Sequence, residues 1–311
     1  MPFRHGLATC VCFLLLLFSG CTQQPAKAPS APPSATAVVR PDPSTLPELG
    51  ASQAIIPGIK AHESTIQRNG VPMRVWYYEP EQPAAGKLPV VLVPPAGSPL
   101  FTGMKLGDGD RAEHYPYVRA GFAVASFDLD GDVPDIQTAT DAVAFQGARE
   151  FRNAQGGLAN AQTALDFVLA KAPNVDPARV YIAGHSSAAT LALLVAEYDP
   201  RIKACVAYAP CTDLQARLGQ FIPTFERAVP GEGEFIKFIS PNTRPELLKC
   251  PVFLFHAEDD SNVPISESRA FAAALQKTNP QVTLVTVPSG DHYESMVREG
   301  IPKGIEWLKA R

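Results

Sequence analysis

The stretch YIAGHSSAAT, from Tyr181 to Thr190, decides how the rest of the chain is interpreted. An apolar run ends here in a histidine and two serines, and small residues follow at once. Gly184 and Ala188 stand two positions before and after Ser186, where larger side chains would collide with the neighbouring chain in a sharp strand–turn–helix. Such a turn strains the backbone at the serine and exposes its hydroxyl. The pattern therefore predicts Ser186 as a nucleophile, with Ala188 replacing the last glycine of the usual G-x-S-x-G.

Two other interpretations of this stretch are open at this point. Ser186 could simply be the N-cap of the helix predicted to follow, since serine is favoured there. Ser187 could be the nucleophile instead, but the residue two positions before it is His185, which is not small. The setting, after an apolar strand and before AATLALLVAEY, favours Ser186 as the nucleophile.

The segments around this stretch alternate between two kinds. Short continuous apolar runs, typical of strands covered on both faces, occupy residues 88–95, 122–128, 179–185, 202–210, 250–257 and 282–288. Helical patterns separate them, at residues 110–120, 157–170, 188–198, 264–277 and 293–309. Ahead of them, an Asn69-Gly70 turn between two alternating runs predicts a hairpin. This order predicts an α/β fold, with a mostly parallel sheet and helices on both faces.

We expect a single domain over residues 51–311, because roughly 260 residues fit one sheet of this type. Residues 212–248 interrupt the alternation between two strands and are long enough to form a small cap. Their apolar runs FIPTF and FIKFI suggest that the cap lines part of a substrate pocket, although such aromatics also serve as plain packing.

The N-terminal residues resemble a bacterial lipoprotein signal. Arg4 precedes the apolar run LATCVCFLLLLF, which is too short to span a bilayer comfortably and suits a secretory signal. The run ends in FSGC, so we expect residues 1–20 to be a signal peptide and Cys21 to carry lipid; plain secretion is the alternative. The Pro/Ala/Ser-rich residues 21–50 predict a disordered tether. The protein would then be exported and held at a membrane surface of the bacterial cell envelope.

Composition and motifs argue against several classes of partner. The formal net charge is −4, which gives no electrostatic reason to expect nucleic acid. The sequence has no Gly-rich phosphate loop and no Cys/His metal cluster, so we expect no cofactor. The stretch DLDGDVPD, residues 128–135, has many carboxylates but not the spacing of a calcium loop, and we interpret it as a solvated loop.

Three cysteines remain after the signal peptide and Cys21 are set aside. They are Cys205, Cys211 and Cys250, an odd number. In an oxidising compartment one disulfide is possible, with Cys205 and Cys250 as neighbours on adjacent strands. All three could equally be small buried apolar residues.

A serine nucleophile needs a base to take its proton and an acid to orient that base. In this kind of fold the acid and then the base follow the serine along the chain. Of the six histidines, His292 in the loop PSGDHYES follows the last predicted strand, where the base should lie. The stretch HAEDDSNVP follows the strand before it and offers Glu258, Asp259 and Asp260 as the acid. Spacing alone leaves the choice among these three open.

From about Leu88 onward the chain resembles the prolyl oligopeptidase-like branch of the α/β-hydrolases, which includes dienelactone-hydrolase-like esterases. The resemblance lies in GHSSAA, in the stretch SPNTRPELLKCPVFLFHAEDDSNVP and in GDHYES, which occur in the family's order. The family's H-G-x-x-D-x-x-V-P pattern places its aspartate on Asp260. Asp259 is the alternative, because Ala257 replaces the family's glycine and could shift the turn. The resemblance implies a Ser186–Asp260–His292 triad.

The resemblance also implies two backbone N–H donors for the oxyanion of a tetrahedral intermediate. One is the N–H of Ser187, at the start of the helix after the nucleophile. The other comes from the loop PPAGSPLFTG. Pro94 and Pro95 have no N–H, so Ala96 or Gly97 must donate, and we expect Ala96.

These features predict a serine hydrolase that acts on a small-molecule ester or a short peptide. The signal peptide and tether leave no room for the N-terminal propeller of true prolyl oligopeptidases, which favours an esterase. A serine peptidase that acts on short peptides is the alternative. A surface protein that keeps the fold only for binding is an alternative of another class. The sequence does not indicate an oligomeric state.

Overall fold

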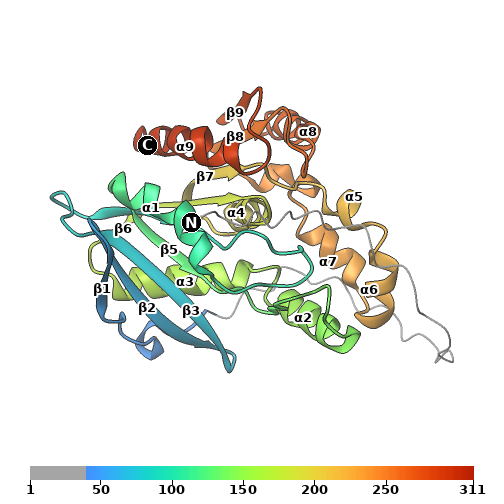
Figure 1. Cartoon of the computed structure of the whole chain (residues 1–311), viewed down its shortest axis with the longest axis horizontal. Coiled ribbons are helices and arrows are strands. Elements are labelled where there is room, and N and C mark those ends of the chain that lie inside the picture. The colour runs from blue at the N-terminus through green and yellow to red at the C-terminus, as the bar shows by residue number, and fades with distance from the viewer. Residues whose placement is uncertain (1–39) are drawn as a thin grey trace, which may run out of the picture. The chain divides into compact units, whose positions relative to one another are not determined.

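The computed structural model describes residues 40–311. Their centre is a nine-stranded sheet in the order β1-β2-β3-β5-β4-β6-β7-β8-β9 (Figure 1). The strands are β1 (Ser52–Ile56), β2 (Ile59–Arg68), β3 (Val71–Pro80), β4 (Leu88–Leu92), β5 (Ala123–Phe127), β6 (Val175–His185), β7 (Ile202–Tyr208), β8 (Val252–Ala257) and β9 (Val282–Val287). From β5 to β9 all neighbouring strands are parallel, whereas β1, β2, β3 and β5 pair antiparallel. The predicted α/β fold with a mostly parallel sheet is confirmed.

The predicted hairpin is the β2–β3 pair. Arg68 and Val71 face each other across a two-residue loop. Asn69 has φ 51° and Gly70 has φ 80°, and two positive φ values are what a type I′ turn requires. The right-handed twist of that turn matches the twist of the two strands, so the local sequence sets their register.

Helices cover both faces of the sheet. α1 (Arg111–Arg119) and α9 (Ile301–Lys309) pack on one face. α3 (Leu158–Lys171), α4 (Ser187–Tyr198) and α8 (Ile265–Leu275) pack on the other face. The central strands β5, β7 and β8 are almost wholly buried between these two layers, which explains why they read as continuous apolar runs.

Some elements differ from the sequence-based expectation. The helix predicted over residues 293–309 is instead a π-helical turn at Met296–Gly300 followed by α9. β1 and the helix α2 (Asp141–Asn153) were not expected. β1 is an edge strand that is mostly exposed, so its apolar pattern is weak.

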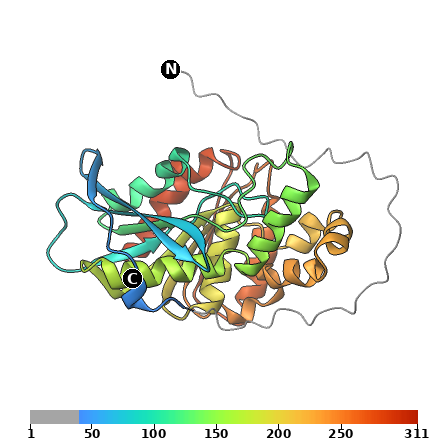
Figure 2. The same ribbon diagram turned by 90° about the horizontal axis from the view of Figure 1, so that it is seen from below.

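The insertion at 212–248 is helical. It contains α5 (Leu214–Leu218), α6 (Ile222–Ala228), α7 (Glu232–Phe238) and two short 3₁₀ turns at Pro241–Thr243 and Pro245–Leu247. Figures 1 and 2 show these helices at the end of the sheet opposite the β2–β3 hairpin, next to α2. Phe145 of α2 packs edge-on against Phe225 of α6, with ring centroids 5.6 Å apart.

The end of the predicted tether is ordered. Residues 43–45 form a 3₁₀ turn, and Leu46 is buried in the main core. Arg40 pairs with Asp166, and Glu48 pairs with Lys171, both on α3. The prediction of a disordered tether over 21–50 is therefore wrong for residues 40–50, because one apolar anchor and two ion pairs hold them against α3. The rest of the tether, residues 1–20 and Cys21 lie outside the described residues.

Two of the four carboxylates after β5 are buried, so our interpretation of DLDGDVPD as a solvated loop is wrong for Asp128 and Asp130. Asp128 is 4% exposed and accepts hydrogen bonds from the Arg74 guanidinium and from the N–H of Leu106. Asp130 is also buried and pairs with Arg68 and Asn160. The partners lie on β2, β3 and α3, so these carboxylates fasten the antiparallel end of the sheet to its parallel part.

Two further observations concern the described residues. Cys205 and Cys211 are buried, Cys250 is partly buried, and all three are free thiols.

Between residues 40 and 311 no helix combines the length and the apolar character needed to cross a bilayer.

We predict that Asp128→Ala lowers the free energy of unfolding by about 3 kcal/mol, because a partly buried guanidinium and a buried N–H lose their acceptor. The matched control is Asp135→Ala, which removes an exposed carboxylate of the same loop and should cost less than about 1 kcal/mol. Urea unfolding followed by circular dichroism measures both. Equal losses in the two variants would contradict the fastening role of Asp128.

Candidate active site

Ser186 stands at the tight turn between β6 and α4. Its backbone has φ 55° and ψ −121°, a conformation that costs a non-glycine residue about 1–3 kcal/mol. A Cβ on Gly184 would lie 2.4 Å from the carbonyl carbon and oxygen of Ala188. Ala188 itself is 1% exposed. The size limits inferred from the sequence at these two positions are therefore the ones that the turn imposes.

Hydrogen bonds hold the turn in place. The N–H of Ser186 donates to the carbonyl of Tyr208 on the neighbouring strand β7 at 2.9 Å. The carbonyl of Ser186 accepts from the N–H groups of Ala189 and Thr190, which start α4. The Ser186 side chain remains partly exposed at the carboxyl edge of the parallel strands.

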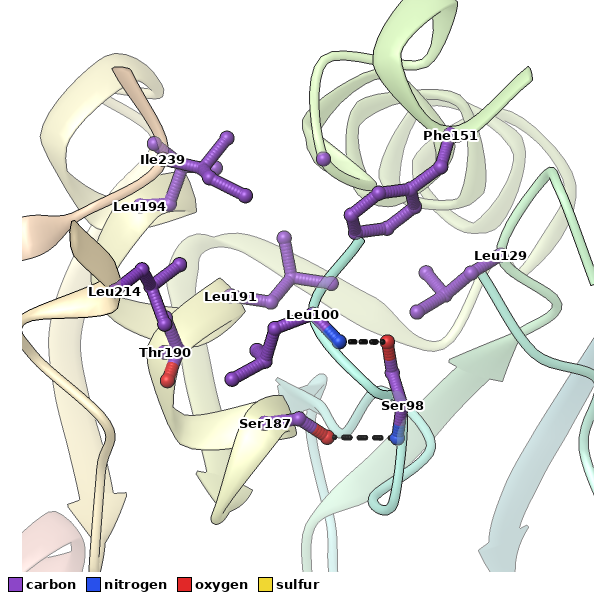
Figure 3. Close-up of a pocket in the computed structure, with 11 residues that line it drawn as sticks. Ser98, Leu100, Leu129, Phe151, Ser187, Thr190, Leu191, Leu194, Leu214 and Ile239 are labelled. Carbon is purple, nitrogen blue, oxygen red and sulfur yellow. Dashed lines mark hydrogen bonds between the residues drawn. The ribbon is translucent and has the colours of Figure 1, made fainter. Parts of the chain in front are cut away.

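Ser187 has a different task. Its Oγ is buried and accepts hydrogen bonds from the N–H groups of Gly97 at 2.9 Å and Ser98 at 3.0 Å. Figure 3 shows the bond to Ser98. The hydroxyl that could have competed with Ser186 as nucleophile instead fastens the loop after β4 to the start of α4.

His292 and Asp260 are hydrogen-bonded partners. His292 Nδ1 donates to Asp260 Oδ2 at 2.7 Å, although the two residues come from different loops. Asp260 Oδ1 accepts from the N–H groups of Asn262 and Val263. This arrangement leaves His292 with Nδ1 protonated and Nε2 unprotonated, which is the tautomer a general base needs.

His256 is a second partner of Asp260 that the sequence reasoning passed over as part of a strand. Its Nε2 lies 3.0 Å from Asp260 Oδ2 and 2.9 Å from the carbonyl of Val263, and Nδ1 contacts Ser268 Oγ at 2.7 Å. His256 is fully buried. Two acceptors face Nε2, so this nitrogen carries a proton and donates. In the sequence HAEDD, His256 and Asp260 are four residues apart, and this spacing could have identified them as a pair.

The pKa values follow from these contacts. Burial alone would raise the pKa of Asp260, but hydrogen bonds from His256 and His292 outweigh it and hold the pKa well below its usual value. Burial lowers the pKa of His292, and the hydrogen bond to Asp260 opposes that effect only in part. Near neutral pH, Asp260 is therefore ionised and His292 is neutral.

Asp259, the alternative acid, binds backbone N–H groups of the loop that carries His292. Its carboxylate accepts from the N–H groups of Gly290 at 3.2 Å and Asp291 at 2.8 Å. Asp291 in turn accepts from the N–H and hydroxyl of Ser261. These bonds fasten the loop after β8 to the loop after β9, while the imidazole of His292 contacts Asp260.

His185 brings the base loop to the nucleophile turn. Its Nε2 donates to the carbonyl of His292 at 3.0 Å, and the two rings lie 4.5 Å apart at a tilt of 44°. On its other side, Nδ1 lies 3.8 Å from Glu113 of α1. These contacts show that His185 supports His292, a role that the sequence analysis did not assign to it.

The nitrogen that would take the serine proton is free. His292 Nε2 is buried and has no hydrogen-bond partner among residues 40–311, so the structure shows no bond between it and Ser186 Oγ. Bonds of this kind are often long in the absence of substrate and tighten when it binds. Ser186 directly follows His185, whose ring packs on His292, so the candidate nucleophile and the candidate base belong to one site.

The predicted oxyanion donors are the backbone N–H groups of Ser187 and Ala96. The N–H of Ser187 lies at the first position of α4, where intrahelical bonds leave N–H groups free. The N–H of Ala96 lies near enough to Asp110 to lower the pKa of that carboxyl. That the N–H of Ala96 donates to an oxyanion stays a prediction.

Asp110 itself is unusual. Burial raises its pKa to about 6, the N–H of Gly107 lowers it, and the nearby charge of Glu113 raises it again. The hydrogen bond from the N–H of Gly107 to Asp110 Oδ2, at 2.8 Å, caps the turn before α1.

A small apolar cavity of about 20 Å³ lies beside Ser187, beneath the cap. Figure 3 shows that its wall is built from the loop after β4, from α4 and from the cap. It is lined by Ser98, Leu100, Leu129, Phe151, Gly156, Ser187, Thr190, Leu191, Leu194, Leu214 and Ile239. A space of this size holds about one water molecule or one methyl group.

No group of three or more His, Cys, Asp or Glu side chains within the described part of the chain could hold a metal ion. The carboxylates of the site are satisfied by histidines, arginines and backbone N–H groups instead.

Several known proteins resemble this chain. The α/β-hydrolase domain-containing protein WAV2 of Arabidopsis thaliana is 24% identical over 165 residues, which is 50% of this chain and 53% of the relative, so the match spans about half of that protein. A cold-adapted esterase from an Arctic intertidal metagenomic library superposes with a TM-score of 0.59 at 18% identity, over 84% of this chain and 97% of the esterase. An acylaminoacyl peptidase superposes with a TM-score of 0.60 at 15% identity, over 81% of this chain and 40% of the peptidase.

The similar solved structures establish the α/β-hydrolase fold, and a comparison with sequence families identifies the family within it. Residues 110–309, which carry the serine turn, the acid loop and the base loop, match the prolyl oligopeptidase family. This match covers more than half of the chain, and we conclude that the protein is a member of the prolyl oligopeptidase family of hydrolases.

Proposed function

We propose that this protein is a serine hydrolase that cleaves carboxylic esters, with Ser186 as nucleophile, His292 as general base and Asp260 as the acid that orients it. One observation carries the proposal: a neutral imidazole, held by a buried carboxylate, has a free Nε2, and its ring packs on His185, the residue directly before a serine in a strained turn. A fold kept only for binding has no need of that strain or of this tautomer.

The proposed reaction has two halves. His292 Nε2 takes the hydroxyl proton as Ser186 Oγ attacks the ester carbonyl, and Asp260 stabilises the imidazolium that forms. Collapse of the tetrahedral intermediate expels the alcohol, which receives that proton, and leaves an acyl-enzyme. Water, deprotonated by His292, then releases the acid and restores Ser186. The N–H of Ser187 donates to the oxyanion in both halves.

Two observations support esters with a short acyl group. The cavity beside Ser187 has room for a methyl group and is lined mainly by apolar side chains. The likeness spans nearly all of the cold-adapted esterase but less than half of the acylaminoacyl peptidase. A serine peptidase acting on short peptides is the competing function, since the same triad cleaves amides.

We predict that a fluorophosphonate probe labels the wild-type protein and that Ser186→Ala abolishes labelling, because the probe reacts only with an activated serine. Ser187→Ala should still be labelled, more slowly, since it keeps the nucleophile but frees the loop at Gly97 and Ser98. In-gel fluorescence measures all three. Equal labelling of wild type and Ser186→Ala, or of neither, would sink the assignment.

We predict that kcat/KM for p-nitrophenyl acetate rises with pH to a plateau, with its half-maximum below pH 6.5, the ordinary pKa of histidine. The sign follows because His292 acts when neutral, and a lowered pKa keeps it neutral at more acidic pH. Asp260→Asn should lower the plateau by about 10⁴-fold, as its amide cannot hold the required tautomer. A half-maximum above pH 7 in the wild type would contradict this account of the base.

We predict faster turnover of p-nitrophenyl acetate than of p-nitrophenyl octanoate, and no measurable turnover of Gly-Pro or Ala p-nitroanilides. The small cavity favours short acyl groups, and anilides test the competing peptidase function. Release of p-nitrophenol and p-nitroaniline gives both rates, with Ser186→Ala as the blank. Efficient anilide cleavage would replace the esterase proposal with the peptidase one.

A further inference from the structure

The cap contains a buried carboxylate without a partner. Glu232, the first residue of α7, is 1% exposed, and neither of its carboxylate oxygens has a hydrogen-bond partner within the described residues. Buried acids are normally paired, because an isolated charge loses its hydration. A carboxylate left in this state is therefore a place where a ligand is expected.

Glu232 lines a small cavity of about 10 Å³ and is the only polar residue in its lining. The other lining residues are Phe101, Leu218, Phe221, Ile222, Phe225 and Ile236. The rings of Phe101 and Phe225 pack against each other with centroids 4.6 Å apart at a tilt of 51°. Aromatic faces attract cations, and a carboxylate among them adds an opposite charge and two acceptors, so the lining suits a cation that donates hydrogen bonds.

The charged neighbours of Glu232 are committed elsewhere. Arg152 Nη1 donates to the carbonyl of Pro230 at 2.6 Å. Glu226 accepts from the N–H groups of Gly231 and Gly233. Burial raises the pKa of Glu232 to about 7, Arg152 opposes this and Glu226 adds to it. Neither neighbour bonds to the Glu232 carboxylate, which remains open to an incoming donor.

An acidic residue in the first turn of a helix commonly stabilises the helix dipole. That role does not explain Glu232, since Glu226 already accepts from N–H groups at the start of α7, and since a dipole effect needs no burial among aromatic rings.

The cavity adjoins the proposed active site. Phe101 belongs to the loop after β4, whose residues Ser98 and Leu100 line the cavity beside Ser187. On the cap side, Ile236 lines one cavity and Ile239, three residues later, lines the other. The two cavities therefore lie along the same loop and under the same cap helix.

Size selects the kind of cation. A space of about 10 Å³ holds a single water-sized group. A primary ammonium is of that size and carries three donors, whereas a trimethylammonium is several times larger and has none.

We propose that Glu232 and the aromatic side chains around it form a subsite for a primary ammonium group, so that the preferred esters carry an amine. This inference rests on the proposed hydrolase function for its link to catalysis, but binding at the subsite can be measured without turnover.

The test compares hexylammonium, hexyltrimethylammonium and 1-hexanol as inhibitors of p-nitrophenyl acetate hydrolysis at pH 8, together with direct calorimetric titration. We expect hexylammonium to bind at least about tenfold more tightly than the other two, because a charge-assisted bond to a buried carboxylate is worth that factor or more. Glu232→Gln should remove this preference and leave kcat/KM for p-nitrophenyl acetate unchanged. Glu234→Gln, an exposed carboxylate on the same helix, is the matched control and should change nothing.

A substrate pair extends the test. We expect the p-nitrophenyl ester of 6-aminohexanoate to have a kcat/KM at least about tenfold above that of hexanoate in the wild type, with equal values in Glu232→Gln. If Glu232→Gln does not fold, Phe225→Leu replaces it and should weaken hexylammonium binding without affecting 1-hexanol.

Two results would overturn the subsite. One is equal affinity of hexylammonium and 1-hexanol in the wild type, and the other is a preference that survives Glu232→Gln. Failure of the hydrolase proposal can be distinguished from failure of the subsite. In that case the fluorophosphonate would not label Ser186, while calorimetry would still report hexylammonium binding that depends on Glu232.

Discussion

The close approach of two backbone segments at the serine turn is the constraint on which the candidate site depends. Gly184 passes so near to Ala188 that no Cβ fits between them, and this contact drives Ser186 to a positive φ. The turn places the Ser186 hydroxyl at the carboxyl edge of the sheet. It also starts α4 directly after the serine, so that the N–H of Ser187 is available at a helix N-terminus.

The loops that meet this turn are held by a network of carboxylates. Asp259 and Asp291 bridge the loops after β8 and β9 through backbone N–H groups and Ser261. Asp260, fixed by His256 and by two backbone donors, then orients His292. Each of these three neighbouring carboxylates therefore has its own set of hydrogen-bond donors. The result is a base whose ring orientation is set by groups that do not themselves meet the substrate.

The cap helices complete the site from the opposite side. They roof the cavity beside Ser187 and, with Phe101, enclose the cavity around Glu232. The fold therefore separates two tasks. The edge of the sheet holds the motifs that the chain shares with its family and that would carry out the proposed chemistry. The insertion supplies the surfaces that would select a substrate. An insertion between two strands can vary in this way without disturbing the strands themselves.

The sequence by itself determined the features that depend on local backbone geometry. The Asn69-Gly70 hairpin, the parallel strands and the size limits around Ser186 follow from turn chemistry and apolar pattern, which act over a few residues. The order of the motifs selected His292, and the family resemblance selected Asp260; the structure brings Nδ1 of the one to 2.7 Å from Oδ2 of the other. Only the tertiary structure decided which distant groups meet: Ser187 accepts from the N–H groups of Gly97 and Ser98, His185 supports His292, and Leu46 anchors a segment that composition predicts to be disordered. A hydrogen bond or a buried contact between remote loops depends on how the whole chain packs, and residue type alone does not specify it.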